Sequence, residues 1–302
     1  MEQYNINDIV SQSIMTKVPT IIVEGIDDIQ VYEDISKSAN VRSHVVASEL
    51  ISPFKSGCVG VTELMESIEQ MPSSRYTVSD YVVGIIDKDI RDYRGEMEEK
   101  SCLFPLKYYS MESHYICCSK ILSLVSSMTK VNSRLLNDNL CEHIKLKINS
   151  SLERLYLASL EALAASLIRG YQGEITYSGS IGRVYCDDNM FGRIESKKDF
   201  LLNLANENDI CFSLDSMRKF VKGKWLLESY IKALELSIKN LSHYCGEDLL
   251  DTCDFCISEV EGKCSYATKE TLSAHSIRAL IMKDVDSDNF NYIRDKFKTL
   301  VN

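Results

Sequence analysis

The chain has 302 residues, 45% of them hydrophobic and 26% charged, which is enough to bury one large core or two modest ones and excludes a disordered protein. Its formal net charge of −10 excludes a generally basic nucleic-acid coat, because such binding depends on Lys and Arg neutralising phosphates. The longest apolar segment, 155–168, is interrupted by Glu161 and is shorter than the roughly 20 residues of a membrane span. No membrane partner is therefore expected.

The cysteines and the N-terminal residues favour a cytoplasmic protein. The 11 cysteines are odd in number and scattered, a pattern typical of reduced, mostly buried thiols rather than a disulfide framework. Residues 1–5 lack the basic flank and apolar stretch of a secretory signal. We therefore expect a reducing, cytoplasmic environment.

The N-terminal part of the chain predicts alternating helices and strands. In chain order the predicted elements are a weak amphipathic helix at 6–15, a strand at 20–23, a helix at 27–38, a short strand at 44–48, a helix at 61–71, and strands at 81–86 and 103–109. This order predicts an α/β fold, with a mostly parallel sheet flanked by helices. The glycine-containing segment 56–60 is expected to be flexible enough to approach a ligand, but it lacks the pattern of a phosphate-binding P-loop.

Three of the predicted strands end in acidic residues. Glu24 follows the first strand and Asp28 stands four residues later, Asp87 and Asp89 follow the third, and Glu112 comes after the fourth. If the first and third strands are neighbours in a parallel sheet, roughly 5 Å apart, their acids meet at one edge. The carboxyl ends of strands are where open α/β sheets bind ligands.

A cluster of four carboxylates repels itself unless a cation neutralises it. Mg²⁺ and Mn²⁺ take carboxylate oxygens, and such a cation can activate water and stabilise a leaving oxygen. Each acid taken alone is explained as well by a helix cap or a surface loop. Taken together, Glu24, Asp28, Asp87 and Asp89 favour a metal site.

The second half of the chain is predicted to be mainly helical. Leucines at helical spacing fill 151–169, and apolar residues from Leu227 to Leu241 step by four and three as in a coiled-coil seam. The glycine-containing segment 170–193 is expected to be an irregular connection or a small hairpin. We therefore expect a catalytic domain at 1–125 and a mainly helical domain at 126–302.

The helical half contains one dense basic patch near 218–225. Arg218, Lys219 and Lys222 precede Trp225, and base stacking on an aromatic ring beside phosphate-binding cations is a mode of single-strand RNA recognition. Solvated lysines at a helix start explain the same pattern equally well. Both interpretations stay open from the sequence.

A group of thiols near the C-terminus raises the question of zinc. Cys253-x-x-Cys256 has ligand spacing, and His243, Cys245 and Cys264 stand nearby. The remaining spacing is irregular, and cysteines three residues apart also suit a buried helix face. A structural zinc is therefore not expected, and Mg²⁺ or Mn²⁺ is the only predicted cofactor.

Two sets of motifs resemble known families. Val23-Glu24-Gly25-x-x-Asp28, followed by a hydrophobic strand into Asp87-x-Asp89, resembles the Toprim domain that topoisomerases, primases and OLD-family nucleases share. The block 108–115, Tyr-Tyr-Ser-Met-Glu-Ser-His-Tyr, and the segment 221–224, Val-Lys-Gly-Lys, resemble a Toprim-like family of prokaryotic anti-phage defence proteins of the PARIS type. One departure is Lys88, which stands between the two aspartates.

The resemblance implies a metal-dependent nuclease, and it implies roles for particular residues. Glu24 corresponds to the glutamate after the first strand, a metal ligand or general acid/base. Asp87 and Asp89 correspond to the paired aspartates that hold the metal. Asp28 corresponds to the second acid of OLD-like members.

Two more catalytic residues are implied in the same way. Glu112 corresponds to the glutamate of the narrower family block, and Lys224 to the lysine that OLD-like sites direct at the scissile phosphate. His114, beside Glu112, is expected to be a packed histidine.

The function implied by the resemblance is that of a toxic effector in anti-phage defence. In PARIS-type systems an ABC-type ATPase holds the effector and releases it when a phage protein is sensed, and the effector, which a homodimer would fit, cleaves host tRNA. An endoribonuclease is therefore favoured over an endodeoxyribonuclease. The alternatives are an OLD-like DNA nickase or endonuclease, and a non-catalytic Toprim scaffold that binds a partner ATPase.

Overall fold

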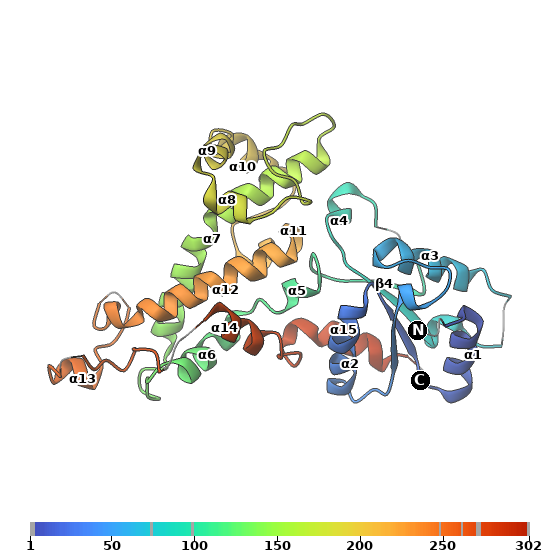
Figure 1. The fold of residues 1–302 in the computed structure, drawn as a ribbon, viewed down its shortest axis with the longest axis horizontal. Helices are drawn as coiled ribbons and strands as arrows, with labels where there is room; N and C mark the ends of the chain where they lie inside the picture. Colours follow the sequence, from blue (N-terminus) through green and yellow to red (C-terminus); the bar gives the residue numbers. More distant parts are fainter. Residues whose placement is uncertain are drawn as a thin grey trace. The chain divides into compact units, whose positions relative to one another are not determined.

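The computed structural model describes residues 4–72, 75–97, 100–247, 249–260, 262–269 and 273–300. The chain forms two compact units. The first contains residues 1–111 together with 284–302, and the second contains residues 112–283 (Figure 1). The sequence predicted a boundary between residues 125 and 126. In the structure the N-terminal part of the first unit ends at residue 111, and residues 284–302 belong to this unit rather than to the helical one.

A four-stranded sheet forms the centre of the first unit. Its strands are β1 (Thr20–Val23), β2 (His44–Ala47), β3 (Val82–Ile86) and β4 (Leu103–Pro105). Their order is β2-β1-β3-β4, and each neighbouring pair runs parallel. The predicted α/β fold with a parallel sheet is confirmed. β1 lies between β2 and β3, so the first and third strands are neighbours.

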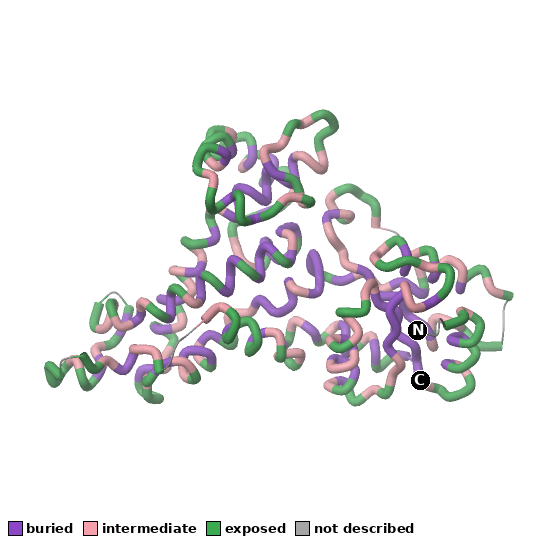
Figure 2. The backbone as a smooth tube through the Cα atoms, in the orientation of Figure 1, coloured by how far each residue is buried: buried purple, intermediate pink, exposed green. Residues whose placement is uncertain are grey.

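Helices cover both faces of this sheet, as Figure 1 shows for α1 and α3 on one side and α2 and α15 on the other. The helices of the first unit are α1 (Ile6–Thr16), α2 (Ile29–Ser38), α3 (Gly57–Glu69), α4 (Arg91–Arg94) and α15 (Asn291–Lys298). Apolar residues of α1 and α3 pack with Ile22 of β1 and Val82 of β3 in one buried cluster. β1 and β3 are buried along their lengths (Figure 2), as the β-branched runs predict for strands covered on both faces.

The segment 56–60, expected to be flexible, begins a helix instead. α3 starts at Gly57, whose φ of +85° suits a residue without Cβ. At Gly60 a Cβ would lie 1.7 Å from the carbonyl oxygen of Lys55. The glycines therefore allow the preceding loop to pack closely against the first turn of the helix.

The C-terminal segment completes the first unit. α15 packs against α2. The backbone N–H of Lys107 donates to the Tyr292 hydroxyl at 2.8 Å, and the Tyr292 ring lies 5.7 Å from that of Phe104. Ile293 and Phe297 are fully buried. These contacts explain why residues after 283 belong with the sheet rather than with the helical unit.

The second unit is helical, as predicted. Its helices are α5 (Met111–His114), whose first residue belongs to the first unit, α6 (Ile121–Met128), α7 (Asp138–Leu167), α8 (Gly182–Cys186), α9 (Asp188–Glu195), α10 (Lys198–Glu207), α11 (Leu214–Phe220), α12 (Gly223–Asn240), α13 (Asp254–Ile257) and α14 (Ala274–Ile281). α12 packs along α7, and its seam residues Leu227, Ile231, Leu234 and Ile238 are buried. The segment 170–193, expected to be irregular, contains α8 and the start of α9.

A buried carboxylate lies inside the second unit. Glu161 of α7 is fully buried and accepts hydrogen bonds from Lys197 Nζ at 2.8 Å, the Tyr171 hydroxyl at 2.6 Å and the Glu174 N–H at 3.0 Å. Three donors thus satisfy a charge that would otherwise be costly to bury.

Within the described ranges, no helix combines the length and the apolar character that crossing a bilayer requires.

Candidate functional site

Glu24 and Asp87 stand at the carboxyl ends of two neighbouring strands. Thr20, Ile21 and Ile22 of β1 pair with Val82, Val83 and Gly84 of β3. Glu24 lies two residues past Ile22 and Asp87 lies three residues past Gly84, and Oε1 of Glu24 accepts a hydrogen bond from the backbone N–H of Asp87 at 2.8 Å. The side chain of Glu24 at the end of β1 is therefore hydrogen-bonded directly to the backbone that follows β3.

Asp28 is brought back to the same strand end by a tight turn. The residues after Gly25 form a 3₁₀ turn, Ile26–Asp28, before α2 begins. Oδ2 of Asp28 accepts from the Gly25 N–H at 3.1 Å, and the Asp28 N–H donates to the Gly25 carbonyl at 3.1 Å. The acid that the sequence places four residues after Glu24 thus lies beside the end of β1.

The two aspartates after β3 adopt different backbone conformations. Oδ1 of Asp87 accepts from the Met111 N–H at 3.3 Å, and the Asp89 N–H donates to the Tyr109 carbonyl at 2.8 Å. Asp89 has a φ of +50°, in the left-handed region, so the chain at Asp87-Lys88-Asp89 is not extended and the two carboxylates do not follow the alternation of a strand. At this turn the backbone N–H of Asp89 and the side chain of Asp87 both form hydrogen bonds with the segment Tyr109–Met111.

The electrostatics of Glu24 reflect this gathering of acids. Burial raises the pKa of the Glu24 carboxyl, and the negative charges of Asp89 and Asp28 raise it further. The Asp87 N–H and the Arg91 guanidinium oppose this shift. The charges of Asp28 and Asp89 therefore favour the protonated form of the Glu24 carboxyl.

Two tyrosines also face the acids. The pKa of Tyr109 is raised by burial and then by the charges of Asp89 and Asp87. The pKa of Tyr32, a buried residue of α2, is raised by burial and then by Asp87 and Asp28. Sequence reasoning did not select either tyrosine, because nothing in the local pattern separates them from core aromatics.

Arg91 is a further site residue that sequence reasoning missed. Its Nη2 lies 3.4 Å from Oδ2 of Asp89, and its Nη1 donates to the Asp87 carbonyl at 3.4 Å. Lys88, between the two aspartates, instead pairs with Asp92. The available signal was the position of Arg91, two and four residues after the aspartates, at the start of α4.

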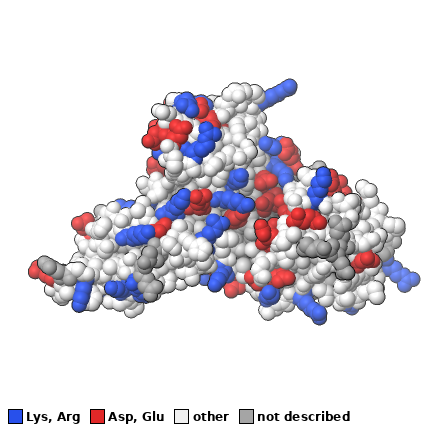
Figure 3. Space-filling view, viewed as in Figure 1, with Lys and Arg blue, Asp and Glu red and all other residues white. Residues whose placement is uncertain are grey.

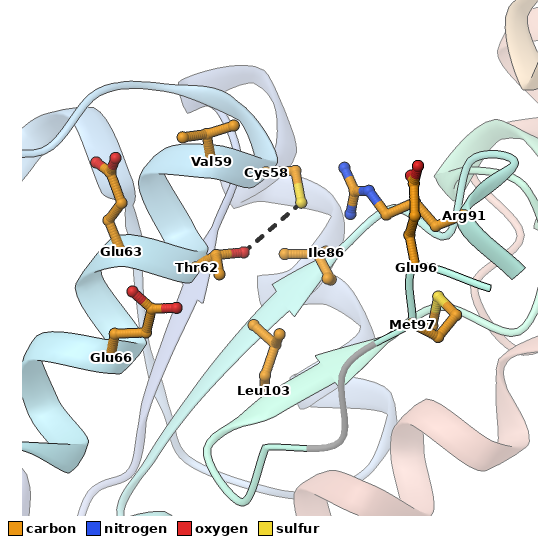
Figure 4. Close-up of a pocket in the computed structure, with 10 residues that line it drawn as sticks. All are labelled: Cys58, Val59, Thr62, Glu63, Glu66, Ile86, Arg91, Glu96, Met97 and Leu103. Atoms are coloured by element: carbon orange, nitrogen blue, oxygen red, sulfur yellow. Dashed lines mark hydrogen bonds between the residues drawn. The ribbon is translucent and has the colours of Figure 1, made fainter. Parts of the chain in front are cut away.

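A small cavity adjoins this arginine. It has a volume of about 240 Å³ and is lined by residues of α3, β3, β4 and the segment around α4. In Figure 4 the Arg91 guanidinium points toward Cys58, whose thiol lies 3.8 Å from the Thr62 hydroxyl. The cavity is smaller than the ~300–1,000 Å³ of sites that enclose a whole small ligand. Arg91 lines it, whereas Glu24, Asp28, Asp87 and Asp89 are not among its lining residues.

The donor set fits a hard divalent cation. Carboxylate oxygens are the protein ligands that Mg²⁺ and Mn²⁺ prefer. Among the described residues, however, only a cysteine group has three or more ligand atoms all within 4.8 Å of one another, so the acids do not form a closed cage. Mg²⁺ keeps several waters and binds through one or two carboxylates. The arrangement of Glu24, Asp28, Asp87 and Asp89 suits such an open site.

Glu112 and Lys224 belong to the second unit, in α5 and at the start of α12. His114 is fully buried, as expected for a packed histidine. The catalytic roles of Glu112 and Lys224 therefore remain predictions.

The predicted stacking surface near 218–225 is corrected by the structure. Trp225 is only 4% exposed and stacks on Tyr177 with ring centroids 5.9 Å apart. Arg218 is 9% exposed, donates to the Ile116 carbonyl at 3.1 Å and pairs with Asp215. Neither side chain is presented to a nucleic acid, because both are used in packing the helical unit.

The lysines of the same patch remain partly available. Lys222 is half-buried and donates to the Tyr177 carbonyl at 2.7 Å, whereas Lys219 and Lys224 are exposed. On the visible face of the helical unit, basic and acidic groups are interspersed rather than gathered by sign (Figure 3). The predicted basic patch is thereby reduced to two exposed lysines and one partly buried lysine.

Comparison with known proteins adds no relative. A scan against protein-family models and a search of the curated proteins each found no match to this chain. The resemblance to Toprim nucleases accordingly depends on the sequence motifs and on the position of their acids at the ends of neighbouring parallel strands.

Proposed function

We propose that this protein is a metal-dependent phosphodiesterase whose site comprises Glu24, Asp28, Asp87 and Asp89. The observation that carries the proposal is the 2.8 Å hydrogen bond that joins Glu24 to Asp87 at the carboxyl ends of two neighbouring parallel strands. This edge is where open α/β sheets bind ligands. All four side chains are carboxylates, the donors suited to Mg²⁺ or Mn²⁺.

In this proposal the acids and Arg91 have different roles in the reaction. A bound divalent cation supplies positive charge for the phosphate and lowers the pKa of a bound water. Asp87 and Asp89 would hold the cation, and Asp28 would bind one of the waters that complete its coordination. Glu24 either joins them or exchanges a proton with the attacking water. Arg91, 3.4 Å from Asp89, limits the repulsion among the acids and offers a cation to the phosphate.

The substrate class and the biological role follow from the resemblance. The motifs at 108–115 and 221–224 support a toxic effector of anti-phage defence that cleaves host tRNA after release from an ABC-type ATPase. In this proposal Glu112 and Lys224 act in catalysis, and the released nuclease is a homodimer. Telling RNA from DNA requires a contact to the 2′-OH, which no motif of this chain identifies.

The test replaces Glu24 by its neutral isostere. Glu24→Gln should abolish Mg²⁺-dependent nucleic-acid cleavage and toxicity in expressing cells, because it removes the charge and keeps the shape. Asp8→Asn is the control, since Asp8 is an exposed acid of α1 on the same unit. Both variants should keep the far-ultraviolet circular dichroism of the wild type. Full cleavage by Glu24→Gln would refute the proposal.

Two further measurements separate the alternatives. Sequencing of RNA and DNA ends from cells that express the wild type distinguishes a ribonuclease from an OLD-like nickase. Co-purification with an ATPase, combined with identical cellular effects of the wild type and Asp87→Ala, would instead favour a scaffold without catalysis.

A further inference from the structure

Four cysteines of the second unit lie together. Cys245, Cys253, Cys256 and Cys264 each offer a sulfur, and the four sulfurs all lie within 4.8 Å of one another. The sulfurs of Cys253 and Cys264 are 3.9 Å apart. None of the four is in a disulfide. The part of the chain that the structure describes contains no other group of this kind.

The sulfur separations match one tetrahedral metal ion. A disulfide would bring two sulfurs to about 2.05 Å. Four thiolates at the Zn–S distance of about 2.3 Å stand about 3.8 Å apart at the corners of a tetrahedron. The separation of 3.9 Å between Cys253 and Cys264 is close to this value. The group is therefore too open for disulfides and has the size of a single-ion site.

The local backbone is built to bring these thiols together. Cys253 caps α13 and Cys256 is the third residue of that helix, so both sulfurs reach the same side of its first turn. Gly246, with a φ of +82°, follows Cys245, and a Cβ there would lie 2.5 Å from the Thr252 hydroxyl. Only a glycine allows this close approach, which sets Cys245 beside Cys253.

Backbone N–H groups point at two of the sulfurs. The Ser265 N–H donates to the Cys253 sulfur at 3.3 Å, and the Cys253 N–H donates to the Cys245 sulfur at 3.3 Å. Such bonds stabilise thiolate ligands and fix their direction. The cluster thus has both a set of ligands and groups that orient them.

The surrounding segment has little apolar burial of its own. Among the described residues of 245–264, only Leu250 and Cys253 are buried, and α13 is four residues long. Several apolar side chains of the segment are exposed: Leu249, Phe255, Ile257 and Val260. So small a core cannot stabilise an irregular loop by apolar burial alone, and structural metals serve this purpose in small modules.

We propose that Cys245, Cys253, Cys256 and Cys264 bind one structural zinc ion. Four protein ligands leave no open coordination position, so the site stabilises the loop and takes no part in catalysis. His243, which the sequence offered as a fifth ligand, is exposed and is not in the group. This proposal is independent of the function assigned to the acids.

From the sequence alone zinc is not expected, because the cysteines outside the Cys253-x-x-Cys256 pair do not have the usual ligand spacing. The structure shows which cysteines pair across the two loops: seven residues separate Cys245 from Cys253, and seven separate Cys256 from Cys264. The loop before α13 begins at Cys245, and the loop after it ends at Cys264. Each loop thus places one sulfur beside the Cys253-x-x-Cys256 pair.

The first test measures metal in the purified wild-type protein. Elemental analysis should find about one zinc per chain, as expected for a Cys₄ site. Protein produced with Co²⁺ should show the intense visible absorption of tetrahedral cobalt thiolate, which a carboxylate site does not give. Iron in place of zinc, or metal-free protein with four titratable thiols, would overturn the proposal.

The second test compares two serine variants. Cys253→Ser should reduce the zinc content to background and open the segment 245–264 to limited proteolysis. Cys186→Ser should keep the full zinc content, because Cys186 is an exposed cysteine outside the group. Glu24→Gln should also keep its zinc, which separates this site from the proposed Mg²⁺ site. Unchanged zinc in Cys253→Ser would contradict the assignment.

Discussion

Two adjacent aspartates after β1 differ in what their side chains do. Asp28 turns back and accepts the Gly25 N–H at 3.1 Å, and its charge raises the pKa of Glu24. Asp27 is exposed. The two residues have the same side chain and are neighbours in the chain, so they provide a matched pair for testing the metal site.

We predict that Asp28→Asn weakens Mn²⁺ binding by about 10-fold or more, as the loss of a ligand or its supporting partner does. Asp27→Asn should leave the dissociation constant unchanged. Isothermal titration calorimetry with Mn²⁺ measures both. Equal affinities for the two variants would remove Asp28 from the site.

At the scale of elements, the contact between β3 and α3 depends on a glycine inside a strand. A Cβ at Gly84 would lie 2.6 Å from Met65 Cγ and 2.8 Å from Val61 Cγ1. Asp87 follows the last residue of β3. The packing of β3 against α3 therefore also positions the Asp87 carboxylate.

Gly84→Ala should lower the free energy of unfolding by about 1–3 kcal/mol through overpacking. In a Met65→Ala background the same substitution should cost less, because one of the two clashing side chains is gone. Urea denaturation of the four proteins gives the coupling energy. An unchanged cost in both backgrounds would contradict the proposed clash.

The buried carboxylate of α7 pairs with the lysine that precedes α10. Glu161 is fully buried and Lys197, just before α10, is its only described charged partner within 4.0 Å. Removing one member of a buried pair leaves a buried charge without compensation.

Lys197→Met should therefore destabilise the helical unit by about 3 kcal/mol. Lys232→Met is the control, because Lys232 pairs with Glu228 on the exposed surface of α12, and such pairs contribute less than about 1 kcal/mol. Chemical denaturation followed by circular dichroism compares them. Similar losses in both variants would show that the Glu161 pair has no special weight.

At the scale of the whole molecule, the first unit is assembled from two distant parts of the sequence. Residues 1–111 provide the sheet, and residues 284–302 return to pack α15 against α2. Phe297 of α15 is fully buried. The stability of the sheet unit therefore depends on the end of the chain.

Phe297→Ala should remove about 3–5 kcal/mol from the first unit. Hydrogen–deuterium exchange should increase in α2 and the strands, while α7 and α12 keep their protection, because they belong to the other unit. Phe255→Ala is the control, since Phe255 is 44% exposed. Equal protection of α2 in both variants would contradict this assembly.

Local patterns predicted most of the elements but fewer of the contacts. The strands at 20–23 and 82–86 were identified because β-branched runs buried on both faces have a clear local signal. The fourth strand ends at Pro105 instead of 109. Helix α3 starts before its periodic apolar residues begin, since glycines give no such signal. The sequence predicts that the acids meet only if the first and third strands are neighbours. The structure shows that β1 and β3 are paired.

The sequence by itself determined the α/β class, the helical second half and the acids that follow the strands, since each depends on residues close together in the chain. Only the tertiary structure decided that Trp225 is buried, that Arg91 reaches Asp89, that α15 returns to the sheet, and that four cysteines meet around α13. These outcomes depend on the path of the backbone between distant residues. A local pattern contains no information on that path, so charge and aromatic content alone could not tell a binding surface from packing.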